Sequence, residues 1–163
     1  MRDQWHGGVL PFLQDARPPV IDPAWCCPLH LPFVHRGRNL PEVTTRLIAV
    51  STGSVLAWRI REATTARQRF RGLLGTPRLA PGECLLITGG AGLRLGASVH
   101  TFGMSYPIDV LFCDSRWTVI HRIACMPPRR LSRWVVGARH IVELPGGTVD
   151  ARVREGERLR LQA

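Results

Sequence analysis

Three polar residues of this chain stand inside apolar segments, where side chains are normally buried. His100 and Asp109 belong to residues 99–112, which read VHTFGMSYPIDVLF, and Glu143 opens residues 143–147, which read ELPGG. Burying an imidazole or a carboxyl group costs free energy unless the group finds a hydrogen-bond partner. These three residues therefore form either a structural polar network or a binding site.

The binding interpretation places six residues around a pocket for a small polar ligand. They are His100, Thr101, Met104 and Asp109, supported by Arg71 and Glu143. In the structural alternative, Asp109 accepts backbone N–H bonds and holds a loop closed. Glu143 would do the same or would form a bidentate pair with Arg71. We favour the structural account for the two acids, while the leading functional hypothesis is a non-catalytic binding or accessory module built on this set.

A hydrolytic site is the second functional hypothesis, with His100 and Asp109 as the only catalytic candidates. With Ser98 or Ser105 they could form a serine–imidazole–carboxylate series. The chain has no Gly-x-Ser-x-Gly elbow, the turn that exposes the nucleophile in many hydrolases. The sequence therefore argues against an enzyme more than for one.

Metal or cofactor binding finds little support in the spacing of donor residues. The imidazole and sulfur donors in question are His100, Met104, Cys113, His121 and Cys125. Soft sulfur with imidazole would suit copper(I) or zinc, but no closely spaced ligand pair is present. The glycines at 89, 90, 92 and 96 lack the phosphate-loop pattern, which also needs a lysine. We expect no metal and no cofactor.

The five cysteines include no CxxC pair. They are Cys26, Cys27, Cys84, Cys113 and Cys125. An odd number without that spacing is neither a disulfide framework nor a zinc site. Cys84 and Cys113 lie in apolar runs and are expected to be small buried residues. Reduced thiols in a cytoplasmic protein are the expectation.

The formal net charge is +10, and all 22 basic residues are arginine, as in proteins of GC-rich bacterial genomes. High charge favours contact with polyanions at low salt, but the arginines look scattered along the sequence. Residues 129–134 interleave arginine with Trp134, so an arginine-mediated RNA or polyanion binder is the third hypothesis. The favoured alternative is an exposed loop with Trp134 packed on the core. Nucleic acid is not the expected partner, and a small polar ligand or a protein partner remains open.

The chain divides into two parts by composition. Residues 1–52 are rich in proline and show no sustained period, so we expect a disordered or wrongly assigned extension. Residues 53–163 are expected to form one domain. No apolar run is long enough for a membrane span, and the N-terminus lacks the features of a secretion signal.

Within residues 53–163 the alternation of apolar and polar residues predicts many short strands. The predicted strands are residues 54–61, 83–88, 98–102, 107–114, 118–124, 139–144 and 158–161. A short helix is expected after Thr64 or Thr65, with Ala66, Phe70 and Leu73 on its apolar face and Gly75 as its stop. The predicted fold is mainly β, a small single-domain barrel or sandwich with one or two short helices.

These motifs, in this order, resemble the DUF192 (UPF0127) family of small bacterial and archaeal proteins. The matching segments are residues 67–75 (RQRFRGLLG), 100–104 (HTFGM), 107–110 (PIDV) and 143–147 (ELPGG), with Val119, Pro128 and Arg130 between them. The chain departs from the family where Gly147 replaces a common alanine and where Gly156-Glu157 replaces Gly-Asp. The resemblance covers residues 53–161 and implies a mainly β, barrel-like fold with no established activity.

Overall fold

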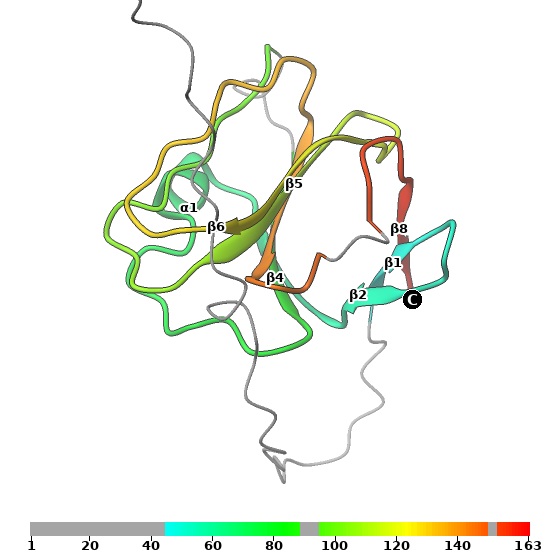
Figure 1. Cartoon of the computed structure of the whole chain (residues 1–163), viewed down its shortest axis with the longest axis horizontal. Coiled ribbons are helices and arrows are strands. Elements are labelled where there is room, and N and C mark those ends of the chain that lie inside the picture. Colours follow the sequence, from blue (N-terminus) through cyan, green and yellow to red (C-terminus); the bar gives the residue numbers. More distant parts are fainter. Residues whose placement is uncertain (1–44, 89–94, 150–152) are drawn as a thin grey trace, which may run out of the picture.

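The strands of this protein are arranged in two sheets (Figure 1). The computed structural model describes residues 45–88, 95–149 and 153–163. One sheet has the order β2-β1-β8, and the other has the order β3-β4-β7-β5-β6. The strands are β1 (Arg46–Ala49), β2 (Val55–Ala57), β3 (Arg59–Ala63), β4 (Glu83–Thr88), β5 (Ile108–Cys113), β6 (Val119–Met126), β7 (His140–Pro145) and β8 (Leu159–Gln162). The single described helix, α1, spans Ala66–Arg71.

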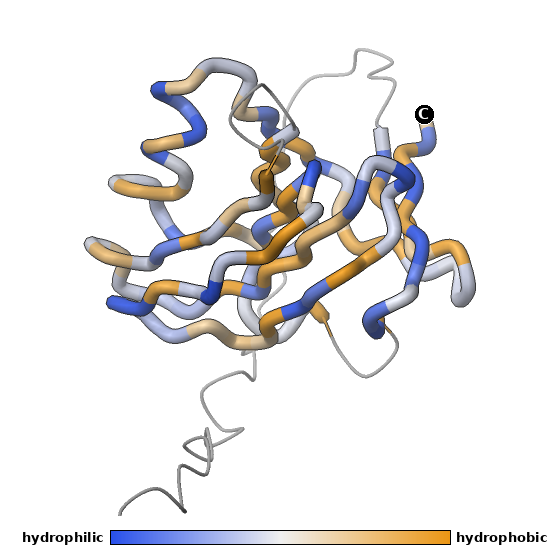
Figure 2. Tube along the Cα trace, turned by 90° about the horizontal axis from the view of Figure 1, so that it is seen from above, coloured by the Kyte–Doolittle hydropathy of each residue, from blue (hydrophilic) through white to orange (hydrophobic). Residues whose placement is uncertain are grey.

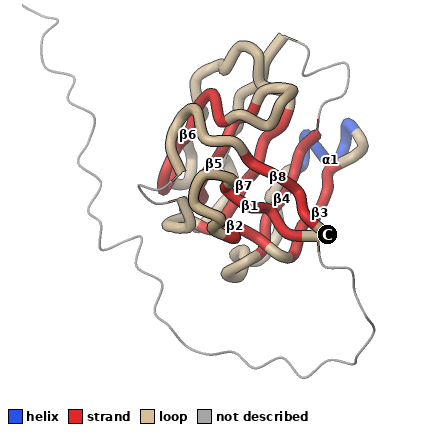
Figure 3. The backbone as a smooth tube through the Cα atoms, turned by 90° about the vertical axis from the view of Figure 1, so that its right-hand side faces the viewer, coloured by secondary structure: helices blue, strands red, loops and turns tan. Residues whose placement is uncertain are grey.

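The architecture confirms the prediction of a small, mainly β domain. Neither sheet is closed into a barrel by the described strands, so the sandwich is the arrangement found. The three-stranded sheet lies on one side of the five-stranded sheet, and α1 lies on the other (Figures 1 and 3). The five-stranded sheet is therefore the central layer, and each of its faces has its own apolar core.

Side-chain alternation along the central strands separates these two cores. Along β5, Val110 and Phe112 belong to the core on the helix side. Leu111 and Cys113 belong to the core between the two sheets, which also contains Leu47 of β1. All six residues of β5 are buried, as expected for a strand covered on both faces. Figure 2 shows the hydrophobic positions concentrated in the middle of the molecule and the hydrophilic ones on the helix and the outer turns.

Helix α1 begins with a capping box and ends after six residues. The Thr65 hydroxyl accepts a bond from the Gln68 N–H, and the Gln68 side chain accepts one from the Thr65 N–H. The helix stops at Gly72, three residues before the predicted stop at Gly75. In this short helix Phe70 does not reach the core and is 80% exposed, contrary to the predicted apolar face.

Most predicted strands are present, with ends shifted by one or two residues. Strand β4 has the predicted bounds, and β5 to β8 overlap the predicted ranges. Residues 98–102 are an exception, because they make one isolated bridge, His100 with Leu131, beside the bridge of the preceding Ala97 with Val135. Isolated bridges do not make a regular strand, and local alternation could not reveal that the partner segment pairs so briefly.

The predicted strand over residues 54–61 is divided between the two sheets. Strand β2 joins the three-stranded sheet and β3 joins the central one, with the crossing at Trp58. The Trp58 N–H donates to the Gly82 carbonyl at 2.9 Å. A Cβ at position 82 would lie 2.2 Å from the indole, so this crossing requires glycine there.

The folded domain begins earlier than Gly53. Strand β1 covers residues 46–49 and pairs with both β2 and β8, so these residues belong to the domain and not to an extension. Strand β8 pairs with β1 and thus completes the smaller sheet. The rest of the predicted extension, residues 1–44, lies outside the described residues.

Candidate functional site

A pocket lies on the helix side of the central sheet, between α1 and the chain that follows Leu95. It has a volume of about 50 Å³, enough for a few water molecules or one small ligand group. Its lining comes from three places: residues 69–74, residues 98–104 and Glu143 of β7. Four of the six residues predicted to bind a ligand line it, namely Arg71, His100, Met104 and Glu143.

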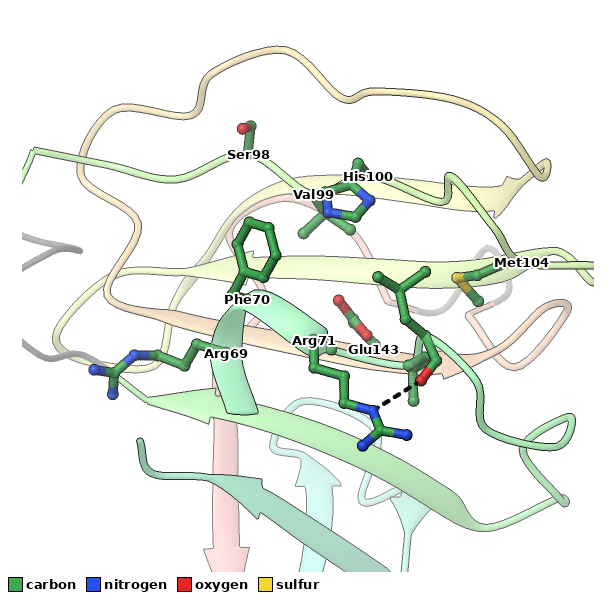
Figure 4. Close-up of a pocket in the computed structure, with 11 residues that line it drawn as sticks. Arg69, Phe70, Arg71, Ser98, Val99, His100, Met104 and Glu143 are labelled. Carbon is green, nitrogen blue, oxygen red and sulfur yellow. Dashed lines mark hydrogen bonds between the residues drawn. The ribbon is translucent and has the colours of Figure 1, made fainter. Parts of the chain in front are cut away.

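Glu143 is the most unusual residue of this pocket. It is only 4% exposed, on a strand whose neighbouring positions are apolar. Figure 4 shows its carboxyl group among Phe70, His100 and Met104. Within the described part of the chain, no hydrogen bond or ion pair reaches this carboxyl group. A buried carboxyl group is normally paired, so the lack of a partner among the described residues sets Glu143 apart from the other residues of the pocket.

Burial raises the pKa of Glu143 to about 7, and the positive charge of Arg61 acts in the opposite direction. The strand register explains both effects. Glu143 lies between Val110 and Leu85 in a row across the sheet, and Arg61 follows Leu85 in that row. Two strand spacings, roughly 10 Å, separate Arg61 from Glu143. At this distance the guanidinium offsets only part of the free-energy cost of ionising the buried carboxyl group. Near neutral pH this group is therefore able to donate or to accept a hydrogen bond.

His100 places a second unsatisfied group at the pocket. Its Nδ1 atom is buried and has no hydrogen-bond partner. Its ring stacks on Phe102, with 5.7 Å between the ring centroids. The bridge to Leu131 holds its backbone in place. Two residues of the pocket, His100 and Glu143, thus carry a polar group for which the described residues supply no hydrogen-bond partner.

Gly72 borders Glu143 and shapes the end of α1. Its backbone has φ 50° and ψ −126°, a combination that L-residues with a side chain rarely adopt. A Cβ there would lie 3.9 Å from one carboxylate oxygen of Glu143, an ordinary contact distance. The glycine is therefore required by the backbone, which must turn away from the helix and pass beside the carboxyl group.

The two arginines of the pocket do not neutralise Glu143. The Arg71 Nε–H donates to the Leu74 carbonyl at 3.2 Å, shown as the dashed line in Figure 4. The Arg69 guanidinium donates to the Thr64 carbonyl at 3.0 Å and points away from the other labelled residues. The predicted pair between Arg71 and Glu143 is thus not formed, because the helix ends at Gly72 and Arg71 bonds to the turn that follows.

Asp109 occupies a different place and matches its predicted structural role. It is fully buried, and its two carboxylate oxygens accept bonds from the backbone N–H groups of Cys125 and Val149, each at 2.6 Å. Burial raises the pKa of Asp109, and these N–H groups act in the opposite direction. Asp109 ties β6 and the segment after β7 to β5, and it does not line the pocket.

Thr101 is also structural in its contacts. It is fully buried. Its hydroxyl donates to the Pro127 carbonyl at 2.7 Å and accepts from the Arg130 N–H at 2.9 Å. These bonds fasten residues 127–130 to the segment that carries His100. Thr101 therefore positions the pocket wall without reaching the pocket itself.

The predicted catalytic trio is not assembled. His100 lines the pocket on the helix side, whereas Asp109 uses both oxygens for backbone bonds on the other face of the sheet. Ser98 also lines the pocket, but Figure 4 shows its hydroxyl pointing away from Glu143. The hydrolase hypothesis built on His100 and Asp109 is therefore wrong in its geometry.

The other donor residues lie apart as well. Cys113 is buried between the sheets, where burial raises the pKa of its thiol to about 12. His121 Nδ1 lies 2.8 Å from a Glu155 carboxylate oxygen. Cys84 and Cys113 are free thiols. Cys26 and Cys27 lie outside the described residues. No cluster of metal-ligating side chains occurs in residues 45–88, 95–149 and 153–163.

Several pocket residues were not singled out by the sequence. Gly72, Phe70 and Val99 are the main ones. All three stand in or beside segments that carry the family resemblance. These motifs marked the region of the pocket in the sequence, but they did not distinguish pocket residues from structural ones.

Trp134 is 56% exposed, which corrects the expectation that it packs on the core. None of the helices in the described part is long and apolar enough to cross a membrane.

Comparison with known proteins places the chain in a family. Residues 48–161 match the DUF192 family, described as "Uncharacterized ACR". A UPF0127 protein of Thermococcus sibiricus is 36% identical over 104 residues, which is 64% of this chain and 66% of that protein. The match thus spans slightly less than two thirds of that relative.

Two crystal structures share the fold. One is a proposed transcription regulator from Sinorhizobium meliloti 1021, with a TM-score of 0.60 and 24% identity over 72% of this chain and 91% of that one. The other is a protein of unknown function from Novosphingobium aromaticivorans, with a TM-score of 0.61 and 19% identity over 81% and 94% of the two chains. At these identities the likeness concerns the fold alone. On the family match and the shared motifs, this chain belongs to the DUF192 (UPF0127) family.

Proposed function

We propose that this protein is a non-catalytic binding module whose pocket, beside α1, receives a hydrogen-bond donor group of a small polar ligand. The observation that carries the proposal is Glu143, a nearly fully buried carboxyl group without a partner in the described part of the chain. A ligand that donates to Glu143 would replace the hydration this group loses on folding.

His100 gives the pocket a second point of recognition. Its ring lines the pocket, and its buried Nδ1 atom has no hydrogen-bond partner among the described residues. Leu73, Val99 and Met104 provide an apolar wall that contacts the carbon skeleton of the ligand. A few polar groups in a mostly apolar hollow are typical of small-molecule sites. A donor group such as an amine, an amide or a hydroxyl fits this arrangement, and a carboxylate does not.

Binding fits the side chains of the pocket better than catalysis does. The pocket has no thiol, and its only hydroxyl, on Ser98, is directed away from the carboxyl group of Glu143. Asp109, the other carboxylate of the hydrolase hypothesis, is used structurally. A nucleophile with a base in hydrogen-bond reach is thus missing from the lining of this pocket. The cytoplasmic location expected from the sequence is part of this proposal.

The test is an NMR titration of the full chain with three small probes: methylammonium, acetamide and acetate. At pH 8.5, where Glu143 is ionised, methylammonium and acetamide should shift the signals of pocket residues such as Val99 and Met104, and acetate should not. In Glu143→Gln the affinity for methylammonium should fall about tenfold, because one charge-assisted hydrogen bond is lost. Glu62→Gln, an exposed carboxylate on β3, is the matched control. Equal shifts with acetate, or unchanged shifts in Glu143→Gln, would contradict the proposal.

A further inference from the structure

Five arginines from two separate parts of the sequence lie beside the pocket in the structure. Arg67, Arg69 and Arg71 belong to α1, the end of which lines the pocket. Arg129 and Arg130 are fastened to Thr101, next to the pocket residue His100, since the Arg129 N–H donates to the Thr101 carbonyl and the Thr101 N–H donates to the Arg130 carbonyl. Residues 64–82 and 127–139, which carry these arginines, contain no Asp or Glu. The surroundings of the pocket are therefore basic, although Glu143 lies inside it.

Several of these arginines have no acidic partner among the residues that the structure describes. Arg67, Arg71, Arg129 and Arg130 are exposed, and none forms an ion pair with a carboxylate of the described residues. By contrast, Arg59 on the edge strand β3 lies 3.7 Å from Glu83. A group of unpaired positive charges attracts an anionic partner and accelerates its association.

Large apolar side chains are exposed on the same side. Phe70 is 80%, Phe102 is 52% and Leu131 is 62% exposed. They are neighbours around the pocket: Phe70 lines it, Phe102 stacks on the pocket residue His100, and Leu131 is bridged to His100. We refer to Phe70, Phe102 and Leu131 as the apolar rim. Exposed apolar groups ringed by charge are characteristic of interaction sites, because their burial is worth about 1.5–3 kcal/mol for each side chain.

We infer that the apolar rim and the arginines around it form a docking surface for an acidic segment of a partner protein that also carries apolar side chains. Carboxylates of the segment would face the arginines, and an apolar side chain would pack between Phe70 and Phe102. Charge complementarity supplies the attraction, and the aromatic rim supplies the buried contact. The inference goes beyond the proposed function, because docking on the rim does not require the pocket to be filled.

Two other anionic partners fit the surface less well. A nucleic acid needs flat faces on which its bases stack, and Leu131, the aliphatic member of the exposed rim, offers none. An anionic membrane is flat, whereas the rim encloses a hollow with a carboxyl group inside it. A polypeptide segment can place carboxylates and apolar side chains at different positions, and so it can satisfy both parts of the surface.

The experiment measures binding of the full chain to an array of short peptides in which Asp and Glu are mixed with Leu and Phe in random order. Peptides that bind are then measured by fluorescence anisotropy. Phe70→Ser and Phe102→Ser should each weaken binding about tenfold, as expected for an aromatic contact at the centre of an interface. Val55→Ser is the matched control, because Val55 is 43% exposed on β2 in the other sheet. Arg67→Gln should weaken binding, and Arg46→Gln on β1 should not.

Glu143→Gln separates this inference from the proposed function, since it should weaken methylammonium binding about tenfold and leave peptide binding within about twofold. The inference is overturned if no peptide of the array binds in a manner that depends on Phe70 and Phe102. It is equally overturned if a peptide of Glu alone binds as tightly as the mixed ones. Tighter, rim-dependent binding of single-stranded RNA, or of phosphatidylcholine–phosphatidylglycerol vesicles, would assign the surface to that class of partner instead.

Discussion

Asp109 and Glu143 lie on neighbouring strands, and their carboxyl groups point to opposite faces of the central sheet. In the pairing of β5 with β7, Asp109 is opposite Leu144, and Glu143 is opposite Val110. Leu144 belongs to the core between the sheets and Val110 to the core on the helix side. One carboxyl group is therefore enclosed by backbone N–H groups, whereas the other reaches the pocket. Two acids that look alike in the sequence thus have different roles.

The raised pKa of Glu143 predicts a specific dependence of stability on pH. Burial holds its pKa at about 7, against an ordinary value of 4.5. The folded protein therefore binds more protons than the unfolded chain between these values, and stability should fall as pH rises from about 4.5 through about 7. A shift of this size corresponds to a loss on the order of 3 kcal/mol.

Urea unfolding of the wild type and of Glu143→Gln at a series of pH values measures this effect. The neutral amide should remove the fall in the free energy of unfolding with rising pH, so that the variant is the more stable protein at pH 8. Glu62→Gln, an exposed carboxylate on β3, should follow the wild-type curve. Parallel curves for wild type and Glu143→Gln would show that Glu143 is ionised in both states without cost.

Replacing Asp109 should destabilise the fold strongly. Asp109→Ala would remove an acceptor that holds the N–H groups of Cys125 and Val149 at 2.6 Å and would leave both without their partner. We expect a loss of about 3 kcal/mol or more in the free energy of unfolding, measured by urea denaturation. Asp114→Ala is a useful comparison, since Asp114 accepts similar backbone bonds in an exposed turn and should cost less. A loss for Asp109→Ala no larger than for Asp114→Ala would refute the structural role.

Gly72 should tolerate no side chain without a cost. Gly72→Ala would force a Cβ onto a backbone with φ 50° and ψ −126°, and about 1–3 kcal/mol of stability should be lost. Gly53→Ala is the control, because its φ is also positive but its surroundings are open and it lies far from the pocket. Both variants should be less stable, but only Gly72→Ala should also change the methylammonium titration. An unchanged titration would mean that the turn at Gly72 does not shape the pocket.

Thr101 should hold the wall of the pocket through its hydroxyl group. Thr101→Val keeps the shape but removes the bonds to the Pro127 carbonyl and the Arg130 N–H. Both backbone groups would lose a partner, with an expected loss of about 1–3 kcal/mol. Hydrogen exchange should show faster exchange of the amides in residues 127–132, where the Arg130 N–H is released. Thr118→Val, in the turn between β5 and β6, should leave these amides unchanged.

The local pattern of the sequence identified most elements correctly, since alternation is a property of a few neighbouring residues. Strand β4 and the capping box at Thr65 could be located in this way. The division at Trp58 could not, because it depends on pairing with strands far along the chain. Residues 98–102 alternate like a strand, but their partner segment offers only isolated bridges.

By itself the sequence determined the mainly β class and the family, because these follow from local patterns and from motifs in fixed order. The tertiary structure alone decided which polar residues share a pocket. Strand register places Glu143 on the face of the sheet toward α1, and the helix end at Gly72 directs Arg71 away from it. It also brought together the arginines of α1 and of residues 129–130, since charge clustering depends on distance in space and not on distance along the chain.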